Sequence, residues 1–334
     1  MASTVFSAFN EFMRDTVNLA SKKTSDARRS RDWLIEQIRL FPDKDSSFPI
    51  LYPEKNTFFG SFARNTKKRP LDDIDLMICL SAMGGTYYEQ PNTIEITVHT
   101  ECRQLTRLCY EGTQKLHSVK VVNKFISLLN EVPQYQNATI KRNQEAATLK
   151  LNSYEWNFDI VPCFFTSEDS AGNTYYLIPD GNGGWKKTDP RRDAERVKNT
   201  NQLHDGNVLD AIRILKYWNK RPTMPSMSSY LLESMVLDFY NKPFTPTASK
   251  FVDIEVPKLL AHIKDHVYHP VEDPKGIQGD INQLSLEDRG KIWSRANEDL
   301  NRANKARQLE NEKDFQGSIF EWSQIFGSEF PSYG

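Results

Sequence analysis

Two aspartates one residue apart, Asp73 and Asp75, begin a run of apolar residues that continues to Leu80. If this run is a β-strand, residues i and i+2 point to one face, so the two carboxylates lie side by side while Ile74 faces the core. Two like charges this close repel each other, and a shared divalent cation relieves the repulsion. Hard oxygen ligands favour Mg²⁺ or Mn²⁺. A solvated strand edge is the alternative for such a pair, and the apolar run argues against it, so the pair predicts a metal site.

A third carboxylate, Asp159, is the candidate to complete a metal site and to take a proton from an attacking hydroxyl. It lies in a predicted strand whose alternating residues Trp156, Phe158 and Ile160 share the opposite, apolar face. A polar group buried there without a partner would cost about 1–3 kcal/mol, and a metal ion would supply the partner. An acid on the solvent face of an amphipathic strand is the alternative.

Residues suited to phosphate lie before and after these carboxylates. The Gly60-Ser61 pair precedes the Asp73 strand, and a turn there offers backbone N–H groups and a hydroxyl to phosphate oxygens. Later, Lys216 stands on a largely apolar helix, and Ser229 stands at the start of the next one. A lysine and a serine converging from two helices would suit a triphosphate. A surface lysine with a buried stem is the alternative for Lys216.

The elements that must position these residues change in kind along the chain. Apolar periodicity predicts helices over residues 6–19, 26–40 and 115–129, and strands over 71–80, 93–98, 147–151, 156–165 and 175–178, with 147–151 and 156–165 forming a hairpin. Residues 181–190 are expected to form a loop. Helices are then predicted over 193–203, 206–219, 229–240, 250–266 and 286–312. Strands first and helices later indicate an α+β fold. We expect a core over residues 1–190 that includes the N-terminal helices, a helical lobe over 191–325 and a flexible tail over 326–334.

Composition favours a small substrate. The 334 residues include 43 Lys and Arg against 44 Asp and Glu, whereas proteins that grip long nucleic acids usually carry a basic excess. The four cysteines have no zinc spacing and are expected to be reduced thiols. No segment approaches the roughly 20 apolar residues of a membrane span, and the N-terminus lacks a secretory-signal pattern, so a cytoplasmic protein is expected.

The order and spacing of these motifs resemble the CD-NTase family, the DncV-like bacterial enzymes related to animal cyclic GMP-AMP synthase and, more distantly, to oligoadenylate synthases. The resemblance covers about residues 50–290 and rests on Gly60-Ser61, Asp73 with Asp75, Asp159, and the stretches LKYW (215–218) and SYLLE (229–233). It implies a polymerase-β-like nucleotidyltransferase core with a C-terminal α-helical lobe, a bilobed arrangement.

The resemblance also implies the site and its chemistry. Asp73 and Asp75 would bind two Mg²⁺ (or Mn²⁺) ions, and Asp159 would complete the catalytic metal site. Ser61, Lys216 and Ser229 would contact the phosphates of ATP and of other nucleoside triphosphates. The implied product is a cyclic di- or trinucleotide second messenger of bacterial anti-phage defence (CBASS).

The chain departs from the family pattern at two points, and its C-terminal tail suggests a possible modification. Many relatives have Gly-Thr where this chain has Asn65-Thr66, and we interpret Asn as tolerated because it adopts left-handed backbone more readily than most residues. The chain lacks the His/Cys zinc cluster of the animal DNA sensor, which argues against activation by DNA. In part of the family a partner related to ubiquitin E1/E2 enzymes conjugates the C-terminus, here Gly334, and a disordered end is the alternative. An activator protein is a further possible partner.

Two other functions stay open at this stage. One is a linear polymerase, either of the oligoadenylate type or adding to tRNA ends, which a basic groove for RNA would favour. The other is a non-catalytic nucleotide-binding scaffold, against which the presence of all three carboxylates argues. Sequence does not specify the bases, the linkage or the ring size.

Overall fold

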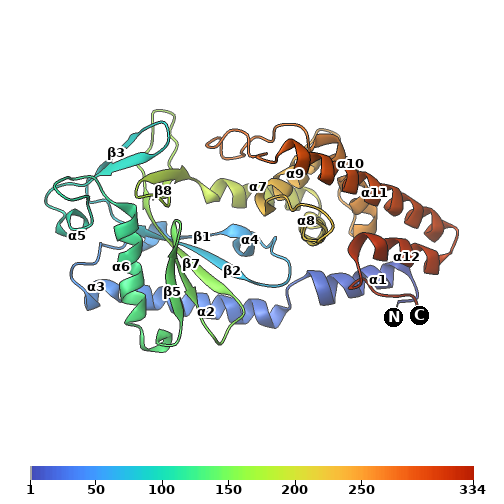
Figure 1. Ribbon diagram of the computed structural model, residues 1–334, viewed down its shortest axis with the longest axis horizontal. Helices are drawn as coiled ribbons and strands as arrows, with labels where there is room; N and C mark the ends of the chain where they lie inside the picture. Colours follow the sequence, from blue (N-terminus) through green and yellow to red (C-terminus); the bar gives the residue numbers. More distant parts are fainter. Residues whose placement is uncertain (1) are drawn as a thin grey trace. The chain divides into compact units, whose positions relative to one another are not determined.

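The computed structural model describes residues 2–334 and divides the chain into two compact units. The sheet unit comprises Lys22–Ala63 and Leu71–Arg191. The helical unit comprises the residues up to Ser21, a short piece Arg64–Pro70, and Arg192–Gly334. Each unit is described by itself below, with the labels of Figure 1.

A mixed nine-stranded sheet forms the centre of the sheet unit, in the order β1-β2-β7-β8-β9-β4-β3, with β6 also paired to β7 and β5 to β6. The strands β2 and β7 are parallel, and the remaining pairs are antiparallel. The strands are β1 Thr57–Phe59, β2 Asp73–Leu80, β3 Thr86–Glu89, β4 Ile94–Thr97, β5 Thr139–Asn143, β6 Ala146–Lys150, β7 Asn157–Phe165, β8 Tyr176–Pro179 and β9 Trp185–Thr188.

Helices surround this sheet. Helix α6 buries Val121, Val122, Phe125, Leu128 and Leu129, whose helical spacing produces one apolar face. It contacts β5, β6, β7 and β8 and stands beside them in Figure 1. The helices of the unit are α2 Ser21–Arg39, α3 Phe41–Lys44, α4 Gly60–Ala63, α5 Arg103–Thr106 and α6 Ser118–Asn130, with 3₁₀ turns at Pro53–Lys55 and Pro133–Tyr135.

The helical unit has a single large apolar core to which both ends of the chain contribute. Phe9 of α1 packs edge-on against the ring of Trp322, and Phe12 packs edge-on against the ring of Tyr217. The rings of Phe9 and Phe12 also both contact the ring of Phe330. The elements of the unit are α1 Val5–Phe12, a π-helical turn η1 Met13–Val17, α7 Pro190–Leu203, α8 Val208–Asn219, α9 Ser229–Tyr240, α10 Val252–His266, α11 Leu286–Asn311 and α12 Phe315–Phe326.

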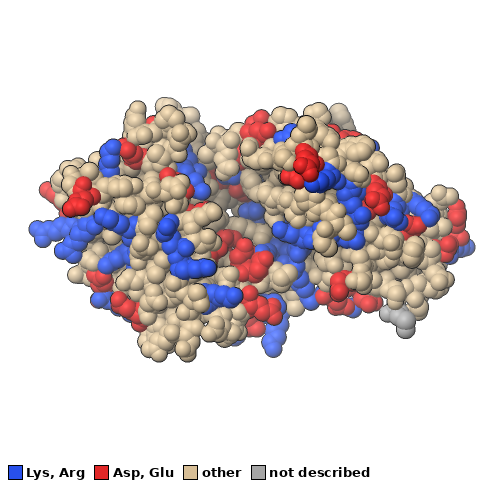
Figure 2. Space-filling model, in the orientation of Figure 1, with Lys and Arg blue, Asp and Glu red and all other residues tan. Residues whose placement is uncertain are grey.

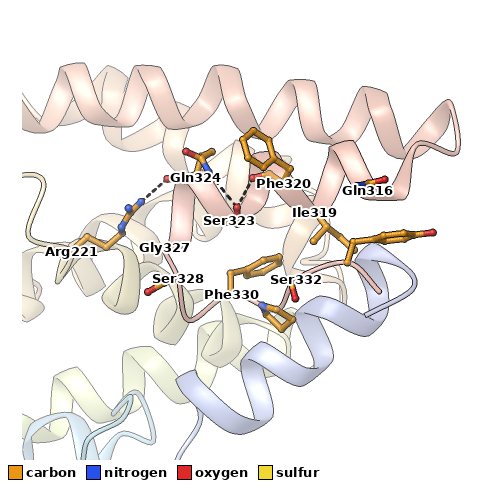
Figure 3. A pocket seen from close by; sticks show the side chains of 12 residues that line it. Arg221, Gln316, Ile319, Phe320, Ser323, Gln324, Gly327, Ser328, Phe330 and Ser332 are labelled. Atoms are coloured by element: carbon orange, nitrogen blue, oxygen red, sulfur yellow. Dashed lines mark hydrogen bonds between the residues drawn. The ribbon is translucent and has the colours of Figure 1, made fainter. Parts of the chain in front are cut away.

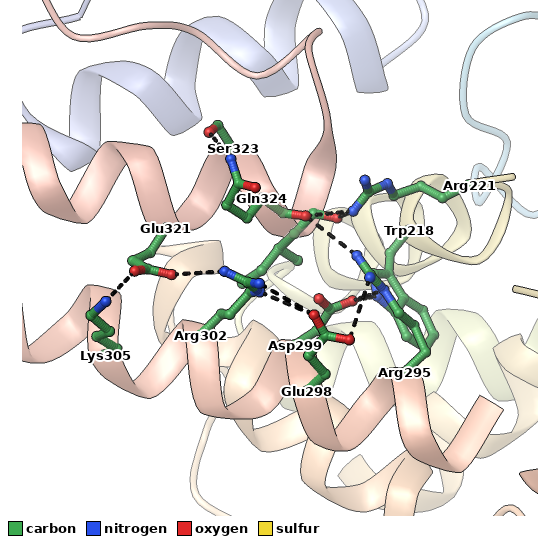
Figure 4. A network of polar contacts seen from close by, with 11 residues as sticks. Trp218, Arg221, Arg295, Glu298, Asp299, Arg302, Lys305, Glu321, Ser323 and Gln324 are labelled. Carbon is green, nitrogen blue, oxygen red and sulfur yellow. Dashed lines mark hydrogen bonds and ion pairs between the residues drawn. The ribbon is translucent and has the colours of Figure 1, made fainter. Parts of the chain in front are cut away.

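A buried polar network joins α8 to the last two helices (Figure 4). Trp218 Nε1 donates to Asp299 Oδ2 over 2.7 Å, and Arg295 forms an ion pair with the same oxygen. Arg221 and Arg295 both donate to the carbonyl oxygen of Gln324, near the end of α12. Cations at a helix C-terminus satisfy carbonyls that lack an intrahelical partner, so this network fixes the end of α12.

The sequence predicted the longer elements except the 12-residue helix α12, and it missed several short ones. Strands β1, β3 and β5 and helix α12 were not predicted, and the expected loop 181–190 contains β9. The hairpin between β6 and β7 is confirmed by their antiparallel pairing. The helix expected over 6–19 is shorter and continues as a π-helical turn, and Phe6 at its start is 54% exposed.

The boundaries of the units also differ from the expected ones. Residues up to Ser21 belong to the helical unit, because the apolar face of α1 is covered by α12 and α8 rather than by the sheet. The tail expected to be flexible is packed: Phe330 is buried among aromatic rings, and Ala2 N donates to Ser332 O over 2.9 Å. No helix within residues 2–334 is long and apolar enough to cross a membrane.

Candidate functional site

The three predicted carboxylates share one face of two neighbouring parallel strands. Asp75 of β2 is the register partner of Asp159 of β7, and Asp73 is the partner of Asn157. All three aspartates are half-buried, whereas the intervening Ile74 and the residues flanking Asp159 are buried. The alternation predicted from the sequence is therefore confirmed, and it places three acidic groups on the same side of the sheet.

The same face turns apolar farther along both strands. Met77 and Cys79 follow Asp75 at intervals of two, and Val161 and Cys163 follow Asp159 in the same way; all four belong to one buried cluster. The four cysteines are buried free thiols, as expected. The apolar cluster anchors the ends of β2 and β7, so that the acidic ends are held by a rigid sheet rather than by a loop.

A neighbouring strand orients Asp159. Thr148 of β6 is the register partner of Asp159, and its hydroxyl donates to Asp159 Oδ1 over 2.5 Å. The hydroxyl is largely buried, so the hydrogen bond is shielded from competing water. Sequence reasoning missed Thr148, although the predicted hairpin of β6 and β7 would have identified it once the register was known.

Gly60 adjoins Asp75 so closely that no side chain fits. Strand β1 pairs with β2 so that Phe59 is the partner of Asp75, and Gly60 follows with φ of +71°. A Cβ built on Gly60 would lie 1.7 Å from Asp75 Oδ2. Ser61 comes next in the short helix α4. The predicted Gly-Ser turn therefore lies beside one of the predicted metal-binding carboxylates, and it must be glycine for space as well as for backbone conformation.

The donor set on this face suits a hard divalent cation. Aspartate oxygens are the ligands that Mg²⁺ and Mn²⁺ prefer, and the missing side chain at Gly60 makes room for the Asp75 carboxylate itself. As the side chains stand, no group of three or more His, Cys, Asp or Glu residues within the described part of the chain forms a ready metal site. The chemistry of these carboxylates fits a divalent metal ion.

The predicted phosphate-binding Lys216 lies in the helical unit, where it is 4% exposed and already engaged. Its ammonium donates to Glu233 Oε2 over 2.5 Å and to Thr66 Oγ1 over 3.0 Å. Arg64 Nε donates to the other oxygen of Glu233 over 2.6 Å. Burial alone would raise the pKa of Glu233, but Lys216 and Arg64 outweigh it and lower this pKa to about 2. Sequence reasoning missed Glu233, Arg64 and Thr66 as partners of Lys216.

Ser229, the other residue predicted in the helical unit, is exposed at the first position of α9. Ser228 caps this helix by accepting a hydrogen bond from Leu231 N over 3.1 Å. The next residue, Tyr230, is held by hydrogen bonds to Asp193 and Asp273. A helix N-terminus attracts anions, so an exposed serine on a firmly held first turn is suited to a phosphate.

A cavity of about 650 Å³ lies elsewhere in the helical unit, between α12 and the tail (Figure 3). Arg221 and residues from Gln316 to Tyr333 line it. None of the predicted site residues lines it.

Charged side chains of both signs are mixed on the surface. Figure 2 shows basic and acidic side chains interspersed on the visible face of each unit, in keeping with a net charge of −1. Long nucleic acids are usually bound by a more uniform basic surface.

Comparison with known proteins identifies the family. No protein-family model matches the chain. A probable cyclic nucleotide synthase of Bacillus cereus (strain VD146), IK1_05630, is 43% identical over 335 residues, which cover 100% of this chain and 99% of that protein.

Solved structures share the fold. Escherichia coli MS115-1 CdnC with ATP has a TM-score of 0.69 at 14% identity, covering 98% of this chain and 99% of that one. Vibrio cholerae DncV, a cyclic AMP-GMP synthase, in complex with the linear intermediate 5′ pppA(3′,5′)pG has a TM-score of 0.69 at 11% identity, covering 99% and 98%. The predicted α+β fold class is thereby confirmed. The extent and identity of the Bacillus match establish that the chain belongs to the CD-NTase family of cyclic nucleotide synthases and is a nucleotidyltransferase.

Proposed function

We propose that this nucleotidyltransferase is metal-dependent and builds a cyclic di- or trinucleotide from ATP and other nucleoside triphosphates, with Asp73, Asp75 and Asp159 at its catalytic centre. The observation that carries the proposal is the register of β2 and β7, which puts the three carboxylates on one face of the sheet. Gly60 supports it, because its missing side chain allows the Asp75 carboxylate to lie directly against the Gly60-Ser61 turn.

In the proposed reaction, a ribose hydroxyl oxygen of one nucleotide forms a bond to the α-phosphorus of another. The bond from that phosphorus to the bridging oxygen breaks, and pyrophosphate leaves. Asp159 receives the hydroxyl proton, and the hydrogen bond from Thr148 holds its carboxylate in place for this role. Two Mg²⁺ or Mn²⁺ ions, held by Asp73, Asp75 and Asp159, would supply charge neutralisation for the phosphates. The transfer is repeated as the product requires, and a final transfer within the linear product closes the ring and releases another pyrophosphate.

Phosphate contacts are assigned to Gly60, Ser61, Lys216 and Ser229. Gly60 and Ser61 offer a backbone turn and a hydroxyl next to Asp75. Ser229 offers a hydroxyl at the start of α9, and Lys216 supplies positive charge. ATP as a substrate is in keeping with the CdnC structure that contains ATP.

The biological setting is proposed on the family resemblance. A cyclic product would act as a second messenger in bacterial anti-phage signalling. A partner protein for this chain would agree with such a signalling role, since the structure of CdnC has been solved in a complex with HORMA-deltaN. An activator protein, or an E1/E2-like partner acting at Gly334, would be the corresponding partner here. Residues 332–334 are exposed, so a partner would reach the end of the chain without unpacking Phe330.

Metal dependence is tested by measuring Mn²⁺ binding with electron paramagnetic resonance and pyrophosphate release in parallel. Wild-type protein should bind Mn²⁺ and lose its activity in EDTA, and the loss should be reversed by excess Mg²⁺. Asp75→Asn should weaken Mn²⁺ binding by about tenfold or more, because it removes one of the anionic ligands. Unchanged Mn²⁺ binding in Asp75→Asn would exclude this face of the sheet as the metal site.

A further inference from the structure

Glu233 is the centre of a buried ionic cluster that joins three parts of the helical unit. Both carboxylate oxygens are used: Oε1 accepts from Arg64 Nε, and Oε2 accepts from Lys216 Nζ and from Thr66 Oγ1 over 2.7 Å. Glu233 is 2% exposed and Thr66 is fully buried. The cluster thus ties α9, α8 and the short piece Arg64–Pro70 to one another.

The short piece Arg64–Pro70 occupies a special place in the chain. The chain leaves the sheet unit after Ala63, just beyond the Gly60-Ser61 turn, and returns at Leu71, just before Asp73. The piece is fastened along its whole length: Arg213 Nε donates to Asn65 O over 3.1 Å, and Arg69 N donates to Val17 O over 2.9 Å. Asn65 has φ of +59°, which confirms the left-handed conformation expected for it.

Stability alone does not account for such a cluster. A buried ion pair is often no more stabilising than apolar side chains of similar volume, because desolvation offsets the attraction. Here one carboxylate faces two cations, Arg64 and Lys216, and Lys67 adds further positive charge near Lys216. Asp193 also acts on Arg64, so the cluster consists of opposed charges held in a fixed arrangement, which is how a supporting shell orients a binding group.

We propose that Glu233 is a positioning residue for nucleotide binding: its carboxylate fixes the Lys216 ammonium and, through Arg64 and Thr66, the chain segment that connects the Gly60-Ser61 turn to the Asp73 strand. The inference rests on the proposed function, because it assigns Lys216 and the Gly60-Ser61 turn to the triphosphate. In this role Glu233 does not touch the nucleotide, since its carboxylate and the phosphates are both negatively charged and repel each other.

If Glu233 acts by keeping Lys216 charged, replacing Glu233 should make ATP binding depend on pH. Replacing a residue with only a structural role should not have this effect. Burial lowers the pKa of Lys216, and Glu233 opposes that effect. Arg64 and Lys67 also act on Lys216 and lower its pKa further. Removing the Glu233 charge therefore moves the deprotonation of Lys216 to lower pH, toward the range in which enzymes are assayed.

The experiment measures ATP affinity by isothermal titration calorimetry with Mg²⁺, and KM and kcat for pyrophosphate release, between pH 6.5 and 9. We expect Glu233→Gln to bind ATP about tenfold more weakly than wild type at pH 6.5, and to lose a further tenfold by pH 9. Wild-type affinity should change much less over this range. Adding Lys216→Arg to Glu233→Gln should remove the pH dependence, because a guanidinium stays charged.

Glu255→Gln is the matched control. Glu255 is 1% exposed in α10 and accepts hydrogen bonds from Tyr240, Ser249 and Lys258. This variant also neutralises a buried carboxylate of the helical unit, so it should lose stability but keep the wild-type affinity and pH profile. If Glu233→Gln does not fold, Thr66→Val keeps the charges and removes one hydroxyl of the cluster; it should still weaken ATP binding severalfold.

The outcomes separate this inference from the proposed function. An active wild type together with wild-type affinity and pH profile in Glu233→Gln would overturn the positioning role and leave the proposed reaction standing. A wild type that binds ATP but releases no pyrophosphate would remove the proposed reaction, and the calorimetric comparison would still decide the role of Glu233. A wild type that does not bind ATP would overturn both.

Discussion

A Cβ atom on Gly60 would lie 1.7 Å from Asp75 Oδ2, so the glycine and the carboxylate occupy adjoining space. A side chain at position 60 therefore cannot be added without moving the carboxylate. The φ of Gly60, +71°, adds a backbone requirement at the same position.

Gly60→Ala should therefore displace Asp75 and reduce activity by at least about a hundredfold, as expected when a catalytic group is misplaced by about 1 Å. Gly172→Ala is the matched control. Gly172 also has positive φ, +77°, but a Cβ there meets nothing within 4 Å. The control should lose similar backbone stability and keep its activity in a pyrophosphate-release assay. Equal activity of the two variants would show that the space beside Asp75 is unimportant.

Thr148→Val tests the hydrogen bond to Asp159. Valine has nearly the same shape but cannot donate, and a hydrogen bond to a charged group contributes about 1.5–3 kcal/mol. If this contribution is used to orient the catalytic carboxylate, kcat should fall about ten- to hundredfold with little change in KM. Thr148→Ser keeps the hydroxyl and should recover most of the activity. A loss of the same size in Thr148→Ser would assign the effect to packing.

Asp299→Ala tests the network that holds the last helices. Asp299 is fully buried and accepts from Trp218 while paired with Arg295. Removing one partner of a buried ion pair costs about 3–5 kcal/mol, because the other charge is left uncompensated. The neighbouring Glu298, whose side chain is 52% exposed, provides the control: Glu298→Ala should cost less than about 1 kcal/mol in urea denaturation. Comparable losses in both variants would contradict the network.

His262 gives the stability a pH dependence. Burial, His266 and Lys242 lower the pKa of His262 from 6.5 to about 3. The unfolded chain therefore takes up a proton near pH 6.5 that the folded protein does not, and the contribution of His262 is complete above pH 6.5 and declines as pH falls toward 3. The melting temperature of wild type relative to His262→Gln should be highest at pH 7.5 and should fall by about a few degrees at pH 5. A constant difference would mean that His262 titrates normally.

The sequence was sufficient for the parts of the fold that depend on local pattern. Apolar alternation around Asp75 and Asp159 predicted two strands because both strands lie in the interior of the sheet, where one face is consistently apolar. Short strands such as β1 and β3 carry too few residues for a periodic signal. The helix at the N-terminus was predicted, but its partners were not, since periodicity identifies an apolar face without specifying what covers it.

The individual motifs of the site could be predicted from the sequence, but the contacts between them could not. Gly60 and Asp75 were found as separate motifs, whereas their contact depends on the pairing of β1 with β2. Thr148 carried no signal by itself, because a threonine in a strand is an ordinary residue, and Glu233 was noted only as the last residue of the SYLLE stretch, without a role of its own. Their importance comes from register and from contacts between residues far apart in the sequence, such as the hydrogen bond between Arg64 and Glu233.

The most direct test of the central claim is the product formed from radiolabelled ATP, GTP, CTP and UTP with Mg²⁺ or Mn²⁺, resolved after phosphatase treatment. We predict a phosphatase-resistant product that is absent with the Asp73→Ala/Asp75→Ala double variant, and omission of each triphosphate in turn would identify its bases. A phosphatase-sensitive ladder, or an equal product from the double variant, would contradict the account.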